Sequence, residues 1–186
     1  MLHPNGLFAS GDLVITCGEH GRIQAFRLPL LQSVWERDLE TGGGATLCDG
    51  LLVLCDERGR TMALRSGDGS IAWQRELPGA LIGAPQLHGK VVLLTTADTI
   101  VRLDAATGQP LPPIPKGSVP WGAPAIGIGE RLVAPTLDGP LLVIDTAKGT
   151  VLYSIDAERN TRVLLAGTTL FVVARDHGVQ TFPQLR

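Results

Sequence analysis

Short runs of apolar residues recur along the whole chain and are separated by turn-forming Gly, Asp and Asn. The clearest runs are Leu13–Ile15, Leu51–Leu54, Val91–Leu94, Leu132–Val133 and Leu170–Val173. Helical repeats need uninterrupted periodic stretches of about ten residues or more. The 23 Gly and 13 Pro of the chain leave few stretches of that length. The pattern therefore predicts an all-β fold.

The apolar runs belong to a repeat. One three-residue motif recurs in each unit, with successive centres 38, 39, 41 and 38 residues apart, at Phe26, Leu64, Leu103, Ile144 and Phe182. A period of about 40 residues fits helical arrays or propeller blades of four strands, and the β-rich runs favour blades. We predict a single β-propeller domain over residues 1–186, made of antiparallel four-stranded blades, with units at 6–44, 45–83, 84–122 and 123–162 and a partial unit at 163–186.

The second unit indicates how one repeat divides into strands. We expect four strands joined by turns, at 45–48, 51–55, 61–64 and 71–75. The second and third strands are apolar at nearly every position, which is typical of a sheet covered on both faces, as a blade is by its neighbours. First strands carry small residues and prolines, namely Ala84-Pro85 and Ala123-Pro124. We expect these first strands to line the narrow axis, where a missing proline N–H costs little.

The end of each unit resembles the signature of pyrroloquinoline-quinone-like propeller repeats, Ala-x-Asp-x-x-x-Gly-x-x-x-Trp. The signature is degenerate. The first unit has Ala25 and Trp35, and the second has Ala63, Gly69 and Trp73, with Arg65 in place of the Asp. The third has Asp104 and Gly108, with Pro112 in place of the Trp, and the fourth has Asp145, Gly149 and Tyr153. The glycine suits the positive φ of a tight turn, and the aspartate can cap that turn. The aromatic residue is expected to pack between neighbouring blades.

The resemblance does not imply that this chain binds the family's cofactor. It implies that a quinone-binding member would carry a vicinal disulfide over the quinone, and Glu, Asn and Asp ligands for Ca²⁺. Cys17, Cys48 and Cys55 are not adjacent, so we expect no quinone and no other cofactor. An odd, sparse set of cysteines indicates small buried residues in a reducing compartment.

Charge and apolar run length exclude two classes of partner. The net charge is −2, and Arg58 and Arg60 stand beside acids, so we do not expect nucleic-acid binding. No segment approaches the ~18 consecutive apolar residues of a membrane span. Residues 1–6 lack the basic start and long apolar stretch of a signal peptide. The sequence therefore predicts a cytoplasmic location.

Loops between the second and third strands are the first candidate binding site. They carry acids and two histidines, at His20, Asp56, Asp98, Asp138, Asp176 and His177. These loops gather on one face of a propeller. In a closed ring of five blades the first and last blades touch, so that His20 and His177 become neighbours and a metal site is conceivable. The alternative is that these residues are simply turn formers.

Loops that lead from one unit to the next lie on the same face. Trp121 follows Pro120 in one of them. A rigidly held aromatic residue suits a binding hot spot, so Trp121 is a candidate anchor for a protein partner. It can equally pack over the rim of the channel.

No catalytic motif accompanies the repeats. Neither Gly-x-Ser-x-Gly nor a phosphate-binding Gly-Lys-Ser/Thr occurs, and no carboxylate pair stands out above the turn acids. We predict a non-enzymatic scaffold for protein–protein interaction in a bacterial multi-subunit or sensor system. The alternatives are a ligand- or metal-binding sensor that uses the channel-mouth loops, and a degenerate propeller hydrolase.

The incomplete fifth unit leaves the ring undecided. The chain can close as a small five-bladed ring, it can be completed by a second copy or a protein partner, or it can be a piece of a longer protein. An open ring would leave apolar faces exposed at both ends.

Overall fold

The computed structural model describes residues 6–18, 21–39, 44–56, 58–77, 79, 81–96, 98–115, 123–137, 139–157, 162–166, 169–174 and 178–182. All the named elements in these ranges are strands, and they form five antiparallel sheets. Within each sheet, consecutive strands pair with one another. The predicted all-β fold of four-stranded units is confirmed. The described residues contain no helix long and apolar enough to cross a membrane.

The first two sheets have four strands each. The first contains β1 (Gly6–Ser10), β2 (Leu13–Cys17), β3 (Arg22–Arg27) and β4 (Gln32–Asp38). The second contains β5 (Gly44–Cys48), β6 (Leu51–Cys55), β7 (Arg60–Arg65) and β8 (Ile71–Glu76).

The remaining three sheets continue the pattern, except that the last has three described strands. The third contains β9 (Gln86–His88), β10 (Val91–Thr95), β11 (Thr99–Asp104) and β12 (Pro110–Pro115). The fourth contains β13 (Ile126–Ile128), β14 (Arg131–Pro135), β15 (Leu141–Asp145) and β16 (Val151–Ile155). The fifth contains β17 (Arg162–Ala166), β18 (Thr169–Ala174) and β19 (Gly178–Phe182).

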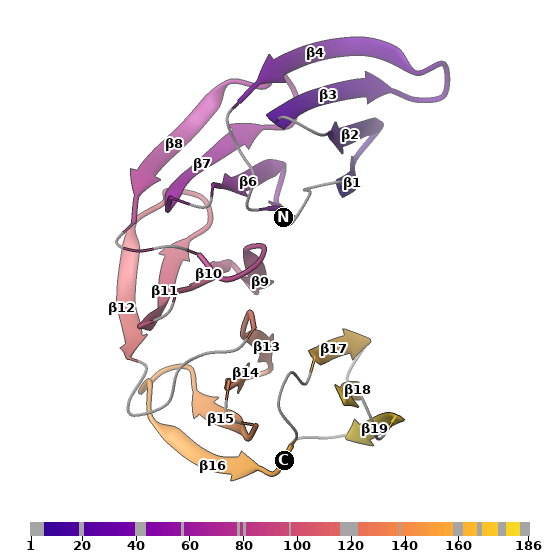
Figure 1. Ribbon diagram of the computed structural model, residues 1–186. Coiled ribbons are helices and arrows are strands. Elements are labelled where there is room, and N and C mark those ends of the chain that lie inside the picture. The colour runs from indigo at the N-terminus through magenta and orange to yellow at the C-terminus, as the bar shows by residue number, and fades with distance from the viewer. Residues whose placement is uncertain are drawn as a thin grey trace.

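The five sheets follow one another around an arc (Figure 1). The first strand of each sheet lies on the inner side of the arc, and neighbouring inner strands contact each other, as β5 does with β1 and β9. The arc is open, because the first sheet lies at one end and the fifth at the other. The sheets are thus propeller blades, but they do not close into a five-bladed ring.

The buried core lies between the sheets. Side chains alternate along a strand, so Leu52 and Leu54 of β6 pack with Ile15 of the first sheet. Val53, between them, packs with Val92 of the third sheet. Each central strand is therefore apolar on both faces, which explains the runs without alternation in the sequence.

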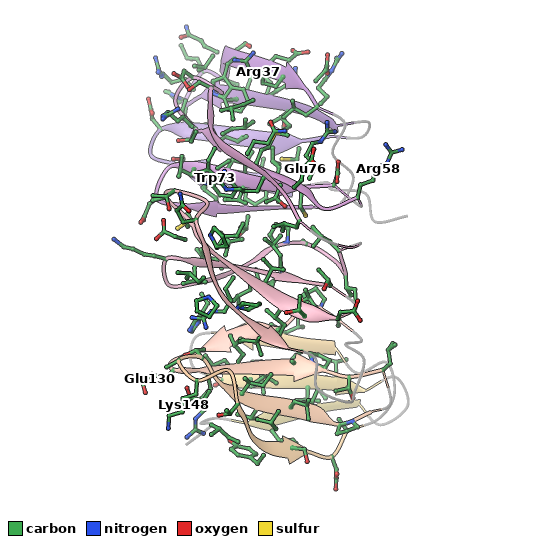
Figure 2. All side chains as sticks on the ribbon, turned by 90° about the vertical axis from the view of Figure 1, so that its left-hand side faces the viewer. Arg37, Arg58, Trp73, Glu76, Glu130 and Lys148 are labelled. Atoms are coloured by element: carbon green, nitrogen blue, oxygen red, sulfur yellow. The ribbon has the colours of Figure 1, made fainter. Side chains whose placement is uncertain are left out.

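Two tryptophans join consecutive sheets on the outer side of the arc. Trp35 of β4 is 9 % exposed, and its Nε1 donates to the carbonyl of Ser66 at 2.7 Å. Trp73 of β8 is 7 % exposed and donates in the same way to the carbonyl of Ala105 at 3.0 Å. The indole N–H is thus satisfied while the ring stays buried between two sheets, as Figure 2 shows for Trp73.

A glycine of the next sheet makes room for each ring. A Cβ built on Gly69 would lie 2.7 Å from the Trp35 ring, and one built on Gly108 would lie 2.6 Å from the Trp73 ring. Both glycines also have a positive φ, of 68° and 66°. The glycine of the repeat is therefore required twice, by the turn and by the aromatic residue packed over it.

Ile114 takes the aromatic position in the third sheet. Spacing alone assigns that position to Pro112, which the structure leaves exposed. The first, second and fourth sheets have a register irregularity beside the aromatic position, whereas in the third sheet it lies further along β11, between Ile100 and Arg102, and the buried position lies further along β12. Ile114 is 1 % exposed, and its Cγ1 would lie 3.7 Å from a Cβ built on Gly149.

The small residues expected in the first strands precede them instead. Pairing begins at Gln86 in β9 and at Ile126 in β13, directly after Ala84-Pro85 and shortly after Ala123-Pro124. A proline has no N–H with which to pair. Small size still matters here, because a Cβ built on Gly44 would lie 2.5 Å from the Cβ of Ala84.

We expect Gly69→Ala to lower the free energy of unfolding by about 2–4 kcal/mol, because the new methyl group meets the Trp35 ring and alanine disfavours a positive φ. Gly67→Ala in the same turn is the matched control. A Cβ built there has no heavy atom within 4 Å, so the change should stay below about 0.5 kcal/mol. Urea unfolding followed by tryptophan fluorescence measures both. Equal losses would contradict the proposed packing of Trp35 on Gly69.

Candidate functional site

Asp56, in the turn between β6 and β7, is held by its own loop. Its Oδ1 accepts hydrogen bonds from the backbone N–H groups of Arg58 at 2.9 Å and Arg60 at 2.8 Å. Its Oδ2 lies 3.1 Å from Nε of Arg60, and the residue is 7 % exposed. The carboxylate thus stabilises the turn and faces the chain rather than a ligand.

Threonines take the place of Asp56 in the next two sheets. Thr96 follows β10 directly, as Asp56 follows β6, and its Oγ1 accepts from the N–H groups of Asp98 at 3.3 Å and Thr99 at 3.1 Å. Thr136 follows β14 and donates from Oγ1 to the carbonyl of Pro140 at 2.8 Å. The sequence pattern missed both threonines, although each comes directly after the second strand of its sheet. Asp98 lies on the exposed side of its turn.

Carboxylates also cap the turns between third and fourth strands. Asp104 accepts from the hydroxyl and the N–H of Thr107, at 2.7 and 2.9 Å, and the Thr107 hydrogen bonds lower the pKa of Asp104. Asp145 accepts from the N–H groups of Ala147 and Lys148, and the Lys148 N–H lowers the pKa of Asp145. These two aspartates shape turns of identical backbone pairing.

The second sheet makes the same turn without an aspartate at the expected position. Arg65 stands there, and Asp68 provides the carboxylate three residues later. Its Oδ1 accepts from the N–H of Ser70 at 2.8 Å and from its hydroxyl at 2.7 Å, and these hydrogen bonds lower the pKa of Asp68. A carboxylate cap is therefore kept, although the repeat signature alone does not locate it.

The other candidate site residues lie outside the described part of the chain. These are His20, Trp121, Asp138, Asp176 and His177. The closed ring that would make the two histidines neighbours is not the arrangement observed, since the first and fifth sheets lie at the two ends of the arc (Figure 1). Among the described residues, no three or more His, Cys, Asp or Glu are grouped to hold a metal ion.

The two faces of the arc present different loops. Figure 2 shows Arg58, from the turn between β6 and β7, and Glu76, at the end of β8, on one face. Glu130 and Lys148, from the turns that follow β13 and β15, lie on the other. In the second sheet, the turn that carries Asp56 and the end of β8 thus share one face.

Tyr153 differs from the two tryptophans at the corresponding position. It is 40 % exposed, because the described part of the fifth sheet has no glycine turn packed over its ring. Arg131 lies over the ring instead, with 5.9 Å between the guanidinium carbon and the ring centroid. Arg131 Nη1 also donates to the Tyr153 hydroxyl at 3.2 Å.

A family model for these repeats matches residues 19–111, half of the chain, and is described as outer membrane protein assembly factor BamB. The chain belongs to this family. Its membership agrees with the PQQ-like repeat resemblance of the sequence. No curated protein sequence matches the chain significantly.

Solved structures similar to the chain include β-propellers. BamB from Moraxella catarrhalis has a TM-score of 0.74 at 18 % identity, over 97 % of this chain and 60 % of that chain. The computationally designed Ika8 protein has 0.76 at 15 % identity, over 95 % and 57 %. The Cps50 (Swd1) β-propeller domain of Myceliophteria thermophila has 0.77 at 16 % identity, over 98 % and 65 %. These identities show the fold alone, and the chain spans about three fifths of each structure.

The open ends of the BamB-family arc carry exposed apolar side chains. In the fifth sheet, Leu164 and Val179 are 58 % and 59 % exposed. The strand register places them on one face, opposite the face that Val172 packs against the fourth sheet. At the other end of the arc, Leu7 of β1 is 74 % exposed.

The free face of the first sheet is more polar than the corresponding faces inside the arc. Where the second sheet has the buried pair Leu54 and Met62, the first has Thr16 and Gln24. Gln24 Nε2 donates to Glu36 at 2.8 Å on this face. The first sheet therefore tolerates water better than the fifth sheet does.

We expect Asp56→Ala to lower the free energy of unfolding by about 1–3 kcal/mol, because two backbone N–H groups lose their acceptor and Arg60 loses an ion pair. Asp56→Asn is the control, since its side-chain oxygen can still accept the turn hydrogen bonds. It should retain most of the stability. Thermal unfolding by circular dichroism measures both, and an unchanged melting temperature for Asp56→Ala would contradict a turn-stabilising role.

The three cysteines are free and buried between the first three sheets. Burial raises the pKa of the Cys17 thiol to about 11 and that of Cys55 to about 12. At neutral pH they should react with a thiol reagent far more slowly in the folded protein than in denaturant. Since unfolding restores an ordinary pKa, the free energy of unfolding should fall as the pH rises above 9. Rapid labelling of all three thiols at pH 8 without denaturant would contradict this burial.

Proposed function

We propose that this protein is a non-enzymatic propeller scaffold whose open arc binds a protein partner. The observation that carries the proposal is the exposed apolar face of the fifth sheet, with Leu164 and Val179. Every interior sheet of the arc has both faces covered by neighbours. Large apolar side chains exposed on one face of a sheet are typical of an interaction site.

The size of the gap left by the described sheets disfavours a second copy as the element that completes the ring. The arc overlays propellers of which it covers 60 % to 65 %, so it follows a similar curvature. Five sheets that occupy about three fifths of a ring leave space for about three more. A second copy would bring five sheets, which is more than this space accepts.

The chemistry of the described loops supports a scaffold over a hydrolase. Three carboxylates accept hydrogen bonds within their own turns, those of Asp56, Asp104 and Asp145. They are therefore poorly placed to act on a substrate. The sensor alternative depends on His20 and His177, which the structure does not describe. The family description names an outer membrane protein assembly factor, and we propose a bacterial multi-subunit assembly as the setting. The cytoplasmic location stays a prediction, which cell fractionation checks.

We expect Leu164→Asp to abolish the partner complex without unfolding the chain, because a carboxylate placed on that apolar face must be desolvated on binding. The matched control is Ile71→Asp, at a side chain 52 % exposed in the second sheet, away from the open ends. The tagged chain is purified from its source cells, its partner is identified by mass spectrometry, and the complex is then rebuilt from purified components.

Light scattering of the purified chain and of the rebuilt complex measures the stoichiometry. We expect a monomer alone and one partner bound per chain. Two outcomes argue against the proposal. One is a stable dimer of the chain that Leu164→Asp dissociates, which would assign the face to a second copy. The other is equal partner loss from both variants.

A further inference from the structure

We propose that Asp49 is a site of spontaneous modification, at which the backbone between Asp49 and Gly50 converts to isoaspartate and weakens the contacts of the second sheet with both of its neighbours. The two residues form the turn between β5 and β6. Asp49 is exposed and Gly50 is half-buried. Glycine has no side chain to shield its amide nitrogen, so the pair has the residue types that this reaction needs. The inference does not depend on the proposed scaffold function.

The reaction uses only the two residues and water. The amide nitrogen of Gly50 attacks Cγ of Asp49 and forms a succinimide ring, while one water molecule leaves with the carboxyl hydroxyl and the amide proton. Water then adds to one of the two ring carbonyls and opens the ring. Addition at the side-chain carbonyl restores aspartate. Addition at the main-chain carbonyl leaves isoaspartate, in which the backbone runs through Cβ and Cγ of the former side chain.

The hydrogen bonds distinguish this pair from the other Asp-Gly pair whose two residues the structure describes. Asp68 Oδ1 accepts from the N–H and the hydroxyl of Ser70, at 2.8 and 2.7 Å, and the Gly69 N–H donates to the carbonyl of Arg65 at 2.9 Å. Within the described part of the chain, the Asp49 carboxylate has no hydrogen-bond or ion-pair partner, and the Gly50 N–H donates to no acceptor. Both reacting groups are therefore held in one turn and free in the other.

The backbone conformation of Asp49 also lowers the cost of reaching the reactive geometry. Its φ is 45°, in the left-handed region that residues other than glycine rarely adopt. The Gly50 nitrogen has to swing toward Cγ, so the turn must first open locally. Opening relieves the strained φ of Asp49. At Asp68, opening has to break the bonds to Ser70 and to move Gly69 away from the Trp35 ring packed over it.

The modified turn is connected to both neighbouring sheets. Cys48 pairs with Leu51 across the turn and is buried against the third sheet. On the side of the first sheet, the Gly50 carbonyl accepts from the Ser66 N–H at 2.8 Å, and the Ser66 carbonyl accepts from Trp35 Nε1 at 2.7 Å. Isoaspartate lengthens the backbone by one methylene group, which displaces Cys48 and the Gly50 carbonyl relative to each other. The modification should therefore loosen both contacts.

Peptide mapping of the chain after several weeks at neutral pH tests the site. Fragments that contain Asp49 and Asp68 are compared by mass spectrometric fragmentation that distinguishes isoaspartate from aspartate. In the folded chain, we expect Asp49 to convert at least about tenfold faster than Asp68, because each hydrogen bond that must break at Asp68 raises the barrier. The same chain in denaturant is the control. There the two residues should convert at similar rates, because both turns are lost.

A second measurement follows the effect on the sheet contacts. The modified chain is separated from the unmodified chain by chromatography. Its Cys48 should react with a thiol reagent at least about tenfold faster than in the unmodified chain. Cys55, at the other end of the pairing between β5 and β6, should keep its rate. Asp49→Gly removes the reacting carboxyl and tolerates the positive φ, so this variant should fold and show no rise in Cys48 labelling after the same incubation.

Two results in the folded chain would overturn the assignment of the site. One is conversion of Asp49 and Asp68 at equal rates. The other is no conversion of Asp49 under conditions in which the denatured chain converts. A modified chain in which Cys48 labelling and tryptophan fluorescence are both unchanged would overturn the proposed loosening of the contacts with the neighbouring sheets.

Discussion

The fold depends on the burial of both faces of each central strand against two neighbouring sheets. A single sheet of this chain has no second layer of its own, since Leu52 and Val53 are adjacent in β6 and yet need apolar partners on opposite sides. Stability in such an array is close to a sum of contacts between nearest neighbours. An interior sheet has two such contacts and a terminal sheet has one. The ends of the arc are therefore where partners have most to contribute.

We call the contact between the outer strand of one sheet and the turn of the next sheet a joint. The joints keep one geometry with different residues. Trp35 and Trp73 each cover a glycine with positive φ and each donate to a carbonyl of the next sheet. The third joint has Ile114 in that position, and this side chain is 1 % exposed. An aliphatic residue cannot donate, but Arg102 of β11 donates from Nη1 to the carbonyl of Thr146 in the fourth sheet at 2.7 Å. The repeat therefore preserves a side-chain donor to this turn carbonyl as well as the close packing, although a different residue type supplies the donor.

The sequence predicted the sheets well because strand order and turn spacing are local properties. It assigned Pro112 to the joint, whereas the structure places Ile114 there, because the bulge between the third and fourth strands lies at a different point in this sheet, which spacing does not show. It grouped Asp98 with Asp56, whereas the residue that corresponds to Asp56 is Thr96, because the two loops differ in where the cap falls. The opening of the arc was undecided, since the angle between sheets depends on packing across the joints.

The candidate site was harder to predict than the fold because turn acids and ligand acids have the same spacing. Only their hydrogen bonds distinguish turn acids from ligand acids. The carboxylates of Asp56 and Asp104 accept hydrogen bonds from backbone N–H groups of their own turns. The ends of the arc carry exposed apolar side chains, and the two ends are not equivalent. On the first sheet, Gln24 is already hydrogen-bonded to Glu36, so covering that face would require these polar groups to be desolvated. On the fifth, Leu164 and Val179 gain free energy when water is removed. Covering the free face of the fifth sheet would therefore stabilise the arc more than covering the free face of the first sheet.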